Sequence, residues 1–223
     1  MAHEEPGKVL KVLDTAIGAA GKLAKNRIDS LRRSNPHRSD AQLLKKLDAA
    51  FTSAVVSSGA ATGAVAAAPG VGTAIGIVAA TGDASWFLTA ASTYVLSAAE
   101  LRGITIEDFE HQRVLVLMVL AGGGGSTFFS KAAGRTGPHL GKVVTNAVPV
   151  TTLRSINKVL GPNFVTKYGT QRGIITLGKV APFGVGLAIG AGGNLLMARS
   201  VIKTTKAMFD SANALNADED DQS

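Results

Sequence analysis

The sequence predicts an all-α protein, a multi-helix bundle of roughly eight helices built from hairpins of small residues that Pro and Gly interrupt. Three observations lead to this class. Apolar residues recur at helical spacing near both ends of the chain. Hydrophobic residues make up 46% of the chain but aromatic residues only 5%, so the apolar content is largely Ala, Val and Leu. The chain also has 26 Gly, and such small residues let helix backbones approach closely.

Residues 1–34 are predicted to form an amphipathic helix, because one face collects its apolar side chains while the basic ones lie mainly off it. That face consists of Val9, Leu10, Val12, Leu13, Ile17, Leu23, Ile28 and Leu31. Pro36 breaks this helix, since a residue that precedes Pro is pushed out of the α region. Ser39 or Asp40 can cap the next helix, which is expected to begin at Ala41.

The stretch from Phe51 to Gly82 contains no charged residue. It is long enough to span a bilayer as one helix, which takes about 20 apolar residues. However, Pro69-Gly70 interrupts it, and it is rich in Ser, Thr and Gly. Two helical arms that meet at Pro69 therefore fit better than one span. Asp83 is expected to lie in a turn and to cap a further apolar helix from Trp86 to Ala99.

Gly103 is predicted to end that apolar helix, and Thr105 to cap the next one, with Asp108 at the third position of a capping box. The following helix should run through residues 107–120, with acidic residues in its first turn as the helix dipole prefers. It is expected to end at the glycine run 122–125.

The C-terminal part repeats the pattern of a Pro-broken hairpin. Residues 181–190 resemble residues 68–76, since both open with Ala-Pro and continue through Gly-Val-Gly to Ala-Ile-Gly, with one inserted residue. Similarity by chance in Ala- and Gly-rich sequence is an equally good explanation. The apolar segment 174–201 is broken by Pro182, and a last amphipathic helix is expected over 195–215.

The domain organisation that follows has three parts. Residues 1–38 form the N-terminal amphipathic helix and its turn, and residues 39–212 form one helical domain. Residues 213–223 are acidic and polar and are predicted to be a disordered tail.

The charge distribution points to a polyanionic partner. Net charge is +7, and no Asp or Glu occurs between Lys131 and Lys206. A surface this one-sided attracts an anionic membrane leaflet or nucleic acid. The predicted anion-binding residues are Lys131, Arg135, Lys142, Arg154, Lys158, Lys167, Arg172, Lys179, Arg199 and Lys203.

A carboxylate-rich metal or catalytic site is an alternative, because metals in helical bundles are held by acidic and His side chains. Glu107 and His111 are four residues apart on the predicted helix and would share a face. There is no second Glu-x-x-His, and capping or ion pairs with Arg102 and Arg113 explain the same residues. The candidate ligands are Asp83, Glu100, Glu107 and His111.

Several kinds of chemistry are disfavoured. The chain has no Cys, which excludes disulfides and thiolate metal sites. None of its four His lies near a nucleophile motif, so a catalytic triad is not supported and no cofactor is predicted. The first residues lack the cationic and apolar regions of a secretory signal, which predicts a location inside the cell.

Two segments resemble the EcsC family of bacterial proteins. The first runs from Ser58 through Asp83 to Gly103 and the acidic helix that ends in Arg113. The second runs from Ala181-Pro182-Phe183-Gly184-Val185-Gly186 to Gly190, Asn194 and Arg199. Together they cover most of residues 45–210. The resemblance implies an all-helical protein. The family is named from an operon that encodes an ABC-type exporter, and its own biochemical activity is poorly defined.

The leading functional prediction is a non-catalytic protein at the inner face of the cell membrane, peripheral or partly inserted, that binds anionic lipid or a membrane protein. The basic residues flank apolar, Gly-rich arms, so they can reach head groups while apolar faces insert. The alternative is a helical-bundle enzyme or a ligand- or metal-binding protein. Nucleic-acid binding is third, because stacking residues that interleave with the charges of the basic segment, such as Phe164 and Tyr168, are few. The sequence also permits self-association.

Overall fold

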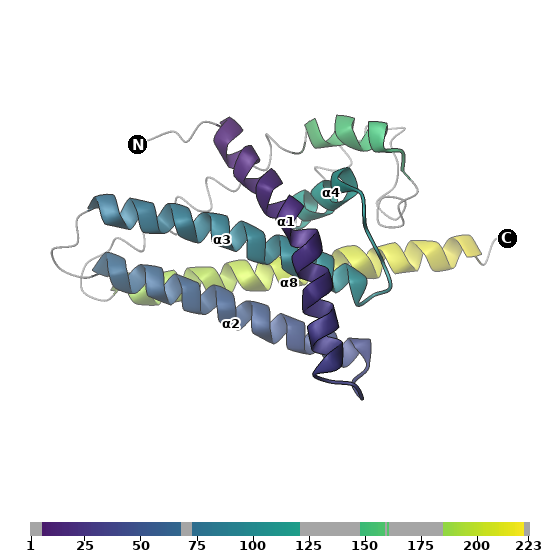
Figure 1. Cartoon of the computed structure of the whole chain (residues 1–223), viewed down its shortest axis with the longest axis horizontal. Coiled ribbons are helices and arrows are strands. Elements are labelled where there is room, and N and C mark those ends of the chain that lie inside the picture. Colours follow the sequence, from purple (N-terminus) through teal and green to yellow (C-terminus); the bar gives the residue numbers. More distant parts are fainter. Residues whose placement is uncertain (1–5, 68–72, 121–147, 159, 161–184, 221–223) are drawn as a thin grey trace.

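The protein is an all-α bundle, as the computed structural model shows (Figure 1). The structure describes residues 6–67, 73–120, 148–158, 160 and 185–220, with side chains described for 10–58, 85–120, 148–158, 160 and 192–210. The labelled helices are α1 (Pro6–Arg33), α2 (Asp40–Ala67), α3 (Thr73–Glu100), α4 (Phe109–Leu120) and α8 (Val185–Asp220). A further helical segment covers 150–158. In these described ranges all regular secondary structure is helical.

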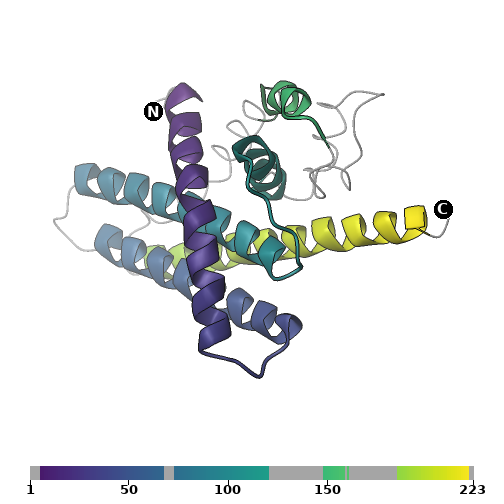
Figure 2. The ribbon, with the colours of Figure 1, turned by 45° about the vertical axis from the view of Figure 1, so that its right-hand side comes forward.

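Three long helices form the body of the molecule, and α1 crosses them. α2, α3 and α8 lie side by side, while α1 packs across α3 at a steep angle (Figures 1 and 2). Ala20 and Ala24 of α1 form a small buried cluster with Leu96 of α3 at this crossing. The small alanine side chains let the two helix backbones approach closely, which the Ala-rich composition predicted.

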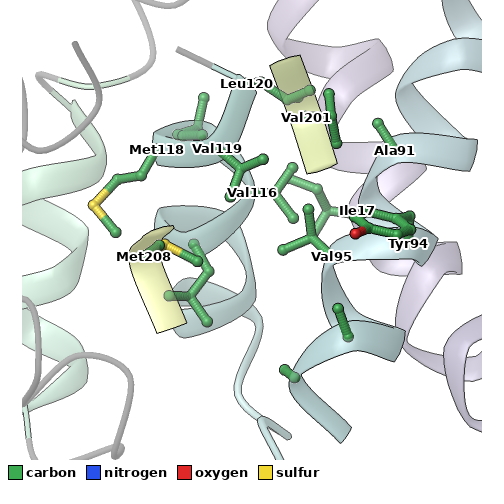
Figure 3. Close-up of a cluster of buried hydrophobic side chains, with 14 of the residues drawn as sticks. Ile17, Ala91, Tyr94, Val95, Val116, Met118, Val119, Leu120, Val201 and Met208 are labelled. Carbon is green, nitrogen blue, oxygen red and sulfur yellow. The ribbon is translucent and has the colours of Figure 1, made fainter. Parts of the chain in front are cut away.

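One hydrophobic core joins α1, α3, α4 and α8 (Figure 3). Ile17 of α1 and Val95 of α3 are both 0% exposed and lie close to Val116 of α4. α8 contributes Val201 and Met208 to the same core. Full burial of one such side chain contributes about 1.5–3 kcal/mol, so this core rather than local propensity holds the helices in place.

The connection between α1 and α2 confirms the predicted break at Pro36. Ser39 forms a capping box with Gln42: the Gln42 backbone N–H donates to Ser39 Oγ at 3.4 Å, and the Ser39 N–H donates to Gln42 Oε1 at 3.2 Å. The Asn35 side chain donates to the Leu31 carbonyl at 2.9 Å and closes the end of α1. Local signals therefore fix this turn.

Gly103 ends α3, as predicted, through a Schellman motif. The Ile104 N–H donates to the Ala99 carbonyl at 3.0 Å, and the Gly103 N–H donates to the Glu100 carbonyl at 3.0 Å. Gly103 has a φ of 75°, a left-handed conformation that glycine adopts without strain.

The prediction of a turn at Asp83 was wrong, because α3 runs without interruption from Thr73 to Glu100. A glycine such as Gly82 costs a helix only about 1 kcal/mol relative to Ala. The stabilisation that α3 gains by packing along α2 outweighs that cost. The expected helix start at Leu195 was also wrong, because α8 begins at Val185. α8 also continues to Asp220, into the segment for which the sequence predicts a disordered tail.

The predicted cap of α4 was also wrong, because Asp108 and not Thr105 caps this helix. Asp108 Oδ1 accepts the backbone N–H groups of Glu110 at 2.8 Å and His111 at 3.2 Å. Ile106 is buried, and its carbonyl accepts the Gln112 side chain at 2.8 Å. This anchoring keeps the residues before Asp108 out of the helix.

We expect Asp108→Ala to lower the free energy of unfolding by about 1 kcal/mol at neutral pH, the usual effect of losing an N-cap. Burial alone raises the pKa of Asp108, but hydrogen bonds from His111 and Glu110 outweigh it and lower the pKa below the ordinary value. The cap therefore stabilises the fold above the usual aspartate range and is lost as pH falls through the lowered pKa. Urea unfolding across acidic pH should show the difference between wild type and variant disappear. Asp108→Asn should keep the cap without this pH dependence, and an Asn variant as unstable as the Ala variant would contradict the assignment.

Candidate functional site

The most basic described surface lies where α1 turns into α2. We call residues 22–46 the elbow; it carries eight cationic side chains and only two carboxylates, Asp29 and Asp40. The cations are Lys22, Lys25, Arg27, Arg32, Arg33, Arg38, Lys45 and Lys46. The elbow forms the lower end of the molecule in both views (Figures 1 and 2).

Polar contacts hold together the two helices that form the elbow, α1 and α2. Lys46 Nζ donates to Asn35 Oδ1 at 2.5 Å, and Asn35 in turn donates to the end of α1. Arg32 pairs with Asp40 at 3.4 Å, and both side chains are about half exposed. One of the two carboxylates is thus already paired, and the charged groups of both helices are kept on one connected surface.

Six cations of the elbow are exposed and make no ion pair with any residue in the described ranges: Lys22, Lys25, Arg27, Arg33, Arg38 and Lys45. Positions 22, 25 and 33 lie on the same outward side of α1, since eleven residues make slightly more than three helical turns. Leu23 is 45% exposed beside them. Cations that no carboxylate neutralises produce a positive potential to which an anionic partner is drawn.

The elbow was not predicted as a binding surface from the sequence. In the chain its cations are interrupted by Asp29 and Asp40, so no acid-free run marks them as it does residues 131–206. The signal was present in α1, whose basic residues lie off its apolar face. Leu13, Ile17 and Ile28 of that face are buried, so the basic side is the one that α1 leaves exposed.

Four of the ten predicted anion-binding residues fall on the described side chains: Arg154, Lys158, Arg199 and Lys203 are all exposed. Arg154 is 3.4 Å from Glu110 Oε1, and with Lys158 it lies on segment 150–158, at the upper end of the molecule, away from the elbow (Figures 1 and 2). The other six lie outside the described residues: Lys131, Arg135, Lys142, Lys167, Arg172 and Lys179.

The structure does not bring the candidate metal ligands together at one site. Glu107 lies before the N-cap of α4, so it does not share a helical face with His111 as expected. Glu100 ends α3 and accepts the Thr105 hydroxyl at 3.4 Å, and the side chain of Asp83 lies outside the described ones. Among the residues with described positions, no three His, Asp or Glu side chains gather as a metal site would require.

His111 is buried and contacts Asp108, the residue that caps the start of α4. Its Nδ1 lies 3.3 Å from Asp108 Oδ1, and its Nε2 has no hydrogen-bond partner in the described part of the chain. The role assigned to this residue by the structure is local, since its polar contacts are with the cap of its own helix.

A polar network fastens segment 150–158 to α4 and α1. Arg113 Nε donates to Asp14 Oδ1 at 2.6 Å, and its Nη1 donates to the Asn157 carbonyl at 3.2 Å. The Asn157 side chain donates to Glu110 Oε2 at 2.6 Å. Arg113 therefore pairs with Asp14, and not with one of the candidate metal ligands as the sequence suggested. Arg102 instead contacts Asp210 at 4.0 Å.

Beyond the α1 crossing, three helices continue as an uncharged arm. We define it as residues 53–67 of α2, 73–90 of α3 and 185–198 of α8; Asp83 is its only charged residue. Asn194 holds α8 to α2 by donating to the Val55 carbonyl at 2.9 Å. The three segments extend together to one side of the molecule (Figures 1 and 2). No helix within the described ranges has the combined length and hydropathy needed to cross a bilayer.

Comparisons of this chain with protein-family models, with curated proteins and with solved structures found no match. The resemblance to the EcsC family therefore stays a prediction from the sequence.

Proposed function

We propose that this chain is a membrane-associated protein without catalytic activity, whose elbow binds anionic lipid head groups at the cytoplasmic leaflet. The observation that supports this most is the set of six exposed cations within 24 residues of chain, from Lys22 to Lys45, that pair with no carboxylate in the part of the chain that the structure describes. Cytoplasmic leaflets carry a negative surface potential, and each Lys or Arg held near such a surface contributes about 1 kcal/mol.

The elbow binds by charge rather than by inserting a helix face. Apart from Leu23, which is 45% exposed, the apolar side of α1 packs on α3 and α4 and is not available to lipid. Electrostatic attraction between exposed groups is screened beyond about 8 Å at physiological ionic strength. Binding through the elbow is therefore expected to weaken strongly with salt.

Head groups suit the elbow better than nucleic acid does. Residues 22–46 contain no Phe, Tyr or Trp, whereas proteins that bind single strands place aromatic side chains under the bases. The resemblance to the EcsC family also favours a membrane location, because the family is named from an operon that encodes an exporter. An acidic surface of a membrane protein would offer the elbow the same kind of charge.

Co-sedimentation with vesicles at low and high salt tests this proposal. We expect wild-type protein to pellet with vesicles that contain phosphatidylserine, to stay in solution with pure phosphatidylcholine, and to be released by high salt. Double-stranded DNA and single-stranded RNA added as competitors should release little protein at equal phosphate concentration. Equal recovery from both kinds of vesicle would refute lipid binding by charge, and complete release by nucleic acid would show that the elbow prefers nucleic acid to lipid.

Neutralising Lys22 and Lys25 together should weaken vesicle binding roughly thirtyfold, since two lost contacts cost about 2 kcal/mol. Gln is the replacement of choice because it keeps helix propensity. The matched control is the double variant Arg154→Gln/Lys158→Gln, which removes the same charge from the opposite end of the molecule. The control should bind within about twofold of wild type. If the control loses as much affinity as the elbow variant, net charge and not the elbow determines binding.

A further inference from the structure

We infer that the uncharged arm enters the bilayer while the elbow and the base of the arm stay at the head groups. This inference rests on the proposed function, because it takes the membrane as the partner. It adds a second contact with the membrane, which depends on the insertion of apolar side chains and not on charge.

The distribution of charge along the arm matches the polarity profile of a leaflet. Residues 53–67, 73–90 and 185–198 contain one charged residue between them. Exposed cations stand where the arm joins the body on α8, at Arg199 and Lys203. Long basic side chains at such a boundary can reach head groups while apolar surface beyond them enters the lipid.

Two large apolar side chains of the arm are exposed. Leu196 of α8 is 68% exposed and Trp86 of α3 is 40% exposed. Scattered exposed apolar residues are common on soluble proteins. Here they belong to a segment that carries no cation and that projects beyond the crossing of α1 and α3 (Figure 2). Trp is the side chain that favours the boundary between lipid and water.

The dimensions of α3 set the depth at which Trp86 should lie. Trp86 is 13 residues from Thr73, the first residue of α3, which is about 20 Å along a helix. Half of the hydrocarbon core of a bilayer is about 15 Å thick. An arm whose end reaches the middle of the bilayer therefore holds Trp86 near the head groups, where its exposed ring is accommodated.

Trp86 is the only Trp of the chain, so its fluorescence reports on the arm alone. On phosphatidylserine vesicles we expect its emission to shift to shorter wavelength and its quenching by aqueous acrylamide to fall. Lipids brominated near the head group should quench it more than lipids brominated at the end of the acyl chain.

A second probe reports on the end of the arm. Because the chain has no Cys, Ala66→Cys can be labelled uniquely with a polarity-sensitive dye, and Ala19→Cys on the exposed side of α1 serves as the matched control. Vesicles should move the label at position 66 into an apolar environment and leave the label at 19 unchanged. Leu196→Asp should bind vesicles at least roughly tenfold more weakly, because a carboxylate opposes insertion.

The outcomes separate the two proposals. Protein that pellets with vesicles while Trp86 and the label at 66 keep their aqueous spectra would overturn insertion and leave binding by the elbow intact. Protein that does not pellet at all would overturn both. Spectral shifts that occur without vesicles and grow with protein concentration would show that a second copy covers the arm, which also overturns insertion.

Discussion

Replacing Phe209 with Ala should lower the free energy of unfolding by about 4 kcal/mol, which places it among the most damaging single substitutions in the chain. Phe209 lies on α8 and is 0% exposed. The guanidinium of Arg102 stands over its ring, 5.3 Å from the centroid, and this cation–π contact is lost with the ring. Truncation therefore leaves a cavity and removes a link between α8 and the end of α3.

Denaturant unfolding followed by circular dichroism measures this change. Phe109→Ala is the matched control, because Phe109 is 38% exposed at the start of α4. The control should lose less than about 1 kcal/mol, as expected for a surface residue. Equal losses in the two variants would mean that α8 does not pack into the core as described.

Replacing Asp48 with Ala should lower the free energy of unfolding by about 3 kcal/mol, because it leaves a buried donor unsatisfied. Asp48 on α2 accepts the Tyr94 hydroxyl at 2.7 Å and pairs with Lys206 Nζ at 2.5 Å, so it links α2 to both α3 and α8. Burial, and then the hydrogen bond and negative charge of Asp48, raise the pKa of Tyr94 far above its usual value. The phenol therefore stays protonated and needs an acceptor throughout the accessible pH range.

A double-mutant cycle isolates the link between Asp48 and Tyr94. Adding Tyr94→Phe to Asp48→Ala should recover part of the loss, since no hydroxyl is then left without a partner. Asp40→Ala on the same helix is the control; its ion pair with Arg32 is exposed, so the loss should be about 0.5 kcal/mol. Strict additivity of the two core substitutions would contradict the contact.

Local signals predicted the helix boundaries where the chain itself supplies the hydrogen-bond partners. Pro36 with Ser39, and Gly103 with its left-handed backbone, could be identified from the sequence because each acts on residues within one turn. Asp108 shows the limit of such signals. Thr105 and Asp108 fit the spacing of a capping box, but burial of Ile106 decides that the helix starts later. That burial depends on packing between helices, which no local pattern contains.

The anion-binding surface was harder to predict because charge acts through space rather than along the chain. Lys206 belongs to the acid-free basic segment, yet it pairs with Asp48 of α2 and is not free for a partner. Lys22 and Lys45 lie near carboxylates in the sequence, yet both are exposed and unpaired among the described residues. The pairing of Arg32 with Asp40 does not change the net charge of the elbow, but it occupies one of the two carboxylates that could neutralise the other cations.

The most direct test of membrane binding through the elbow is a titration of anionic lipid at constant salt. Wild-type protein is incubated with vesicles in which phosphatidylserine replaces phosphatidylcholine in steps from zero, and the bound fraction is measured by sedimentation. We expect almost no binding at zero and a steep rise with anionic content, because several cations of the elbow engage the surface together. A bound fraction that does not depend on the anionic content would contradict it.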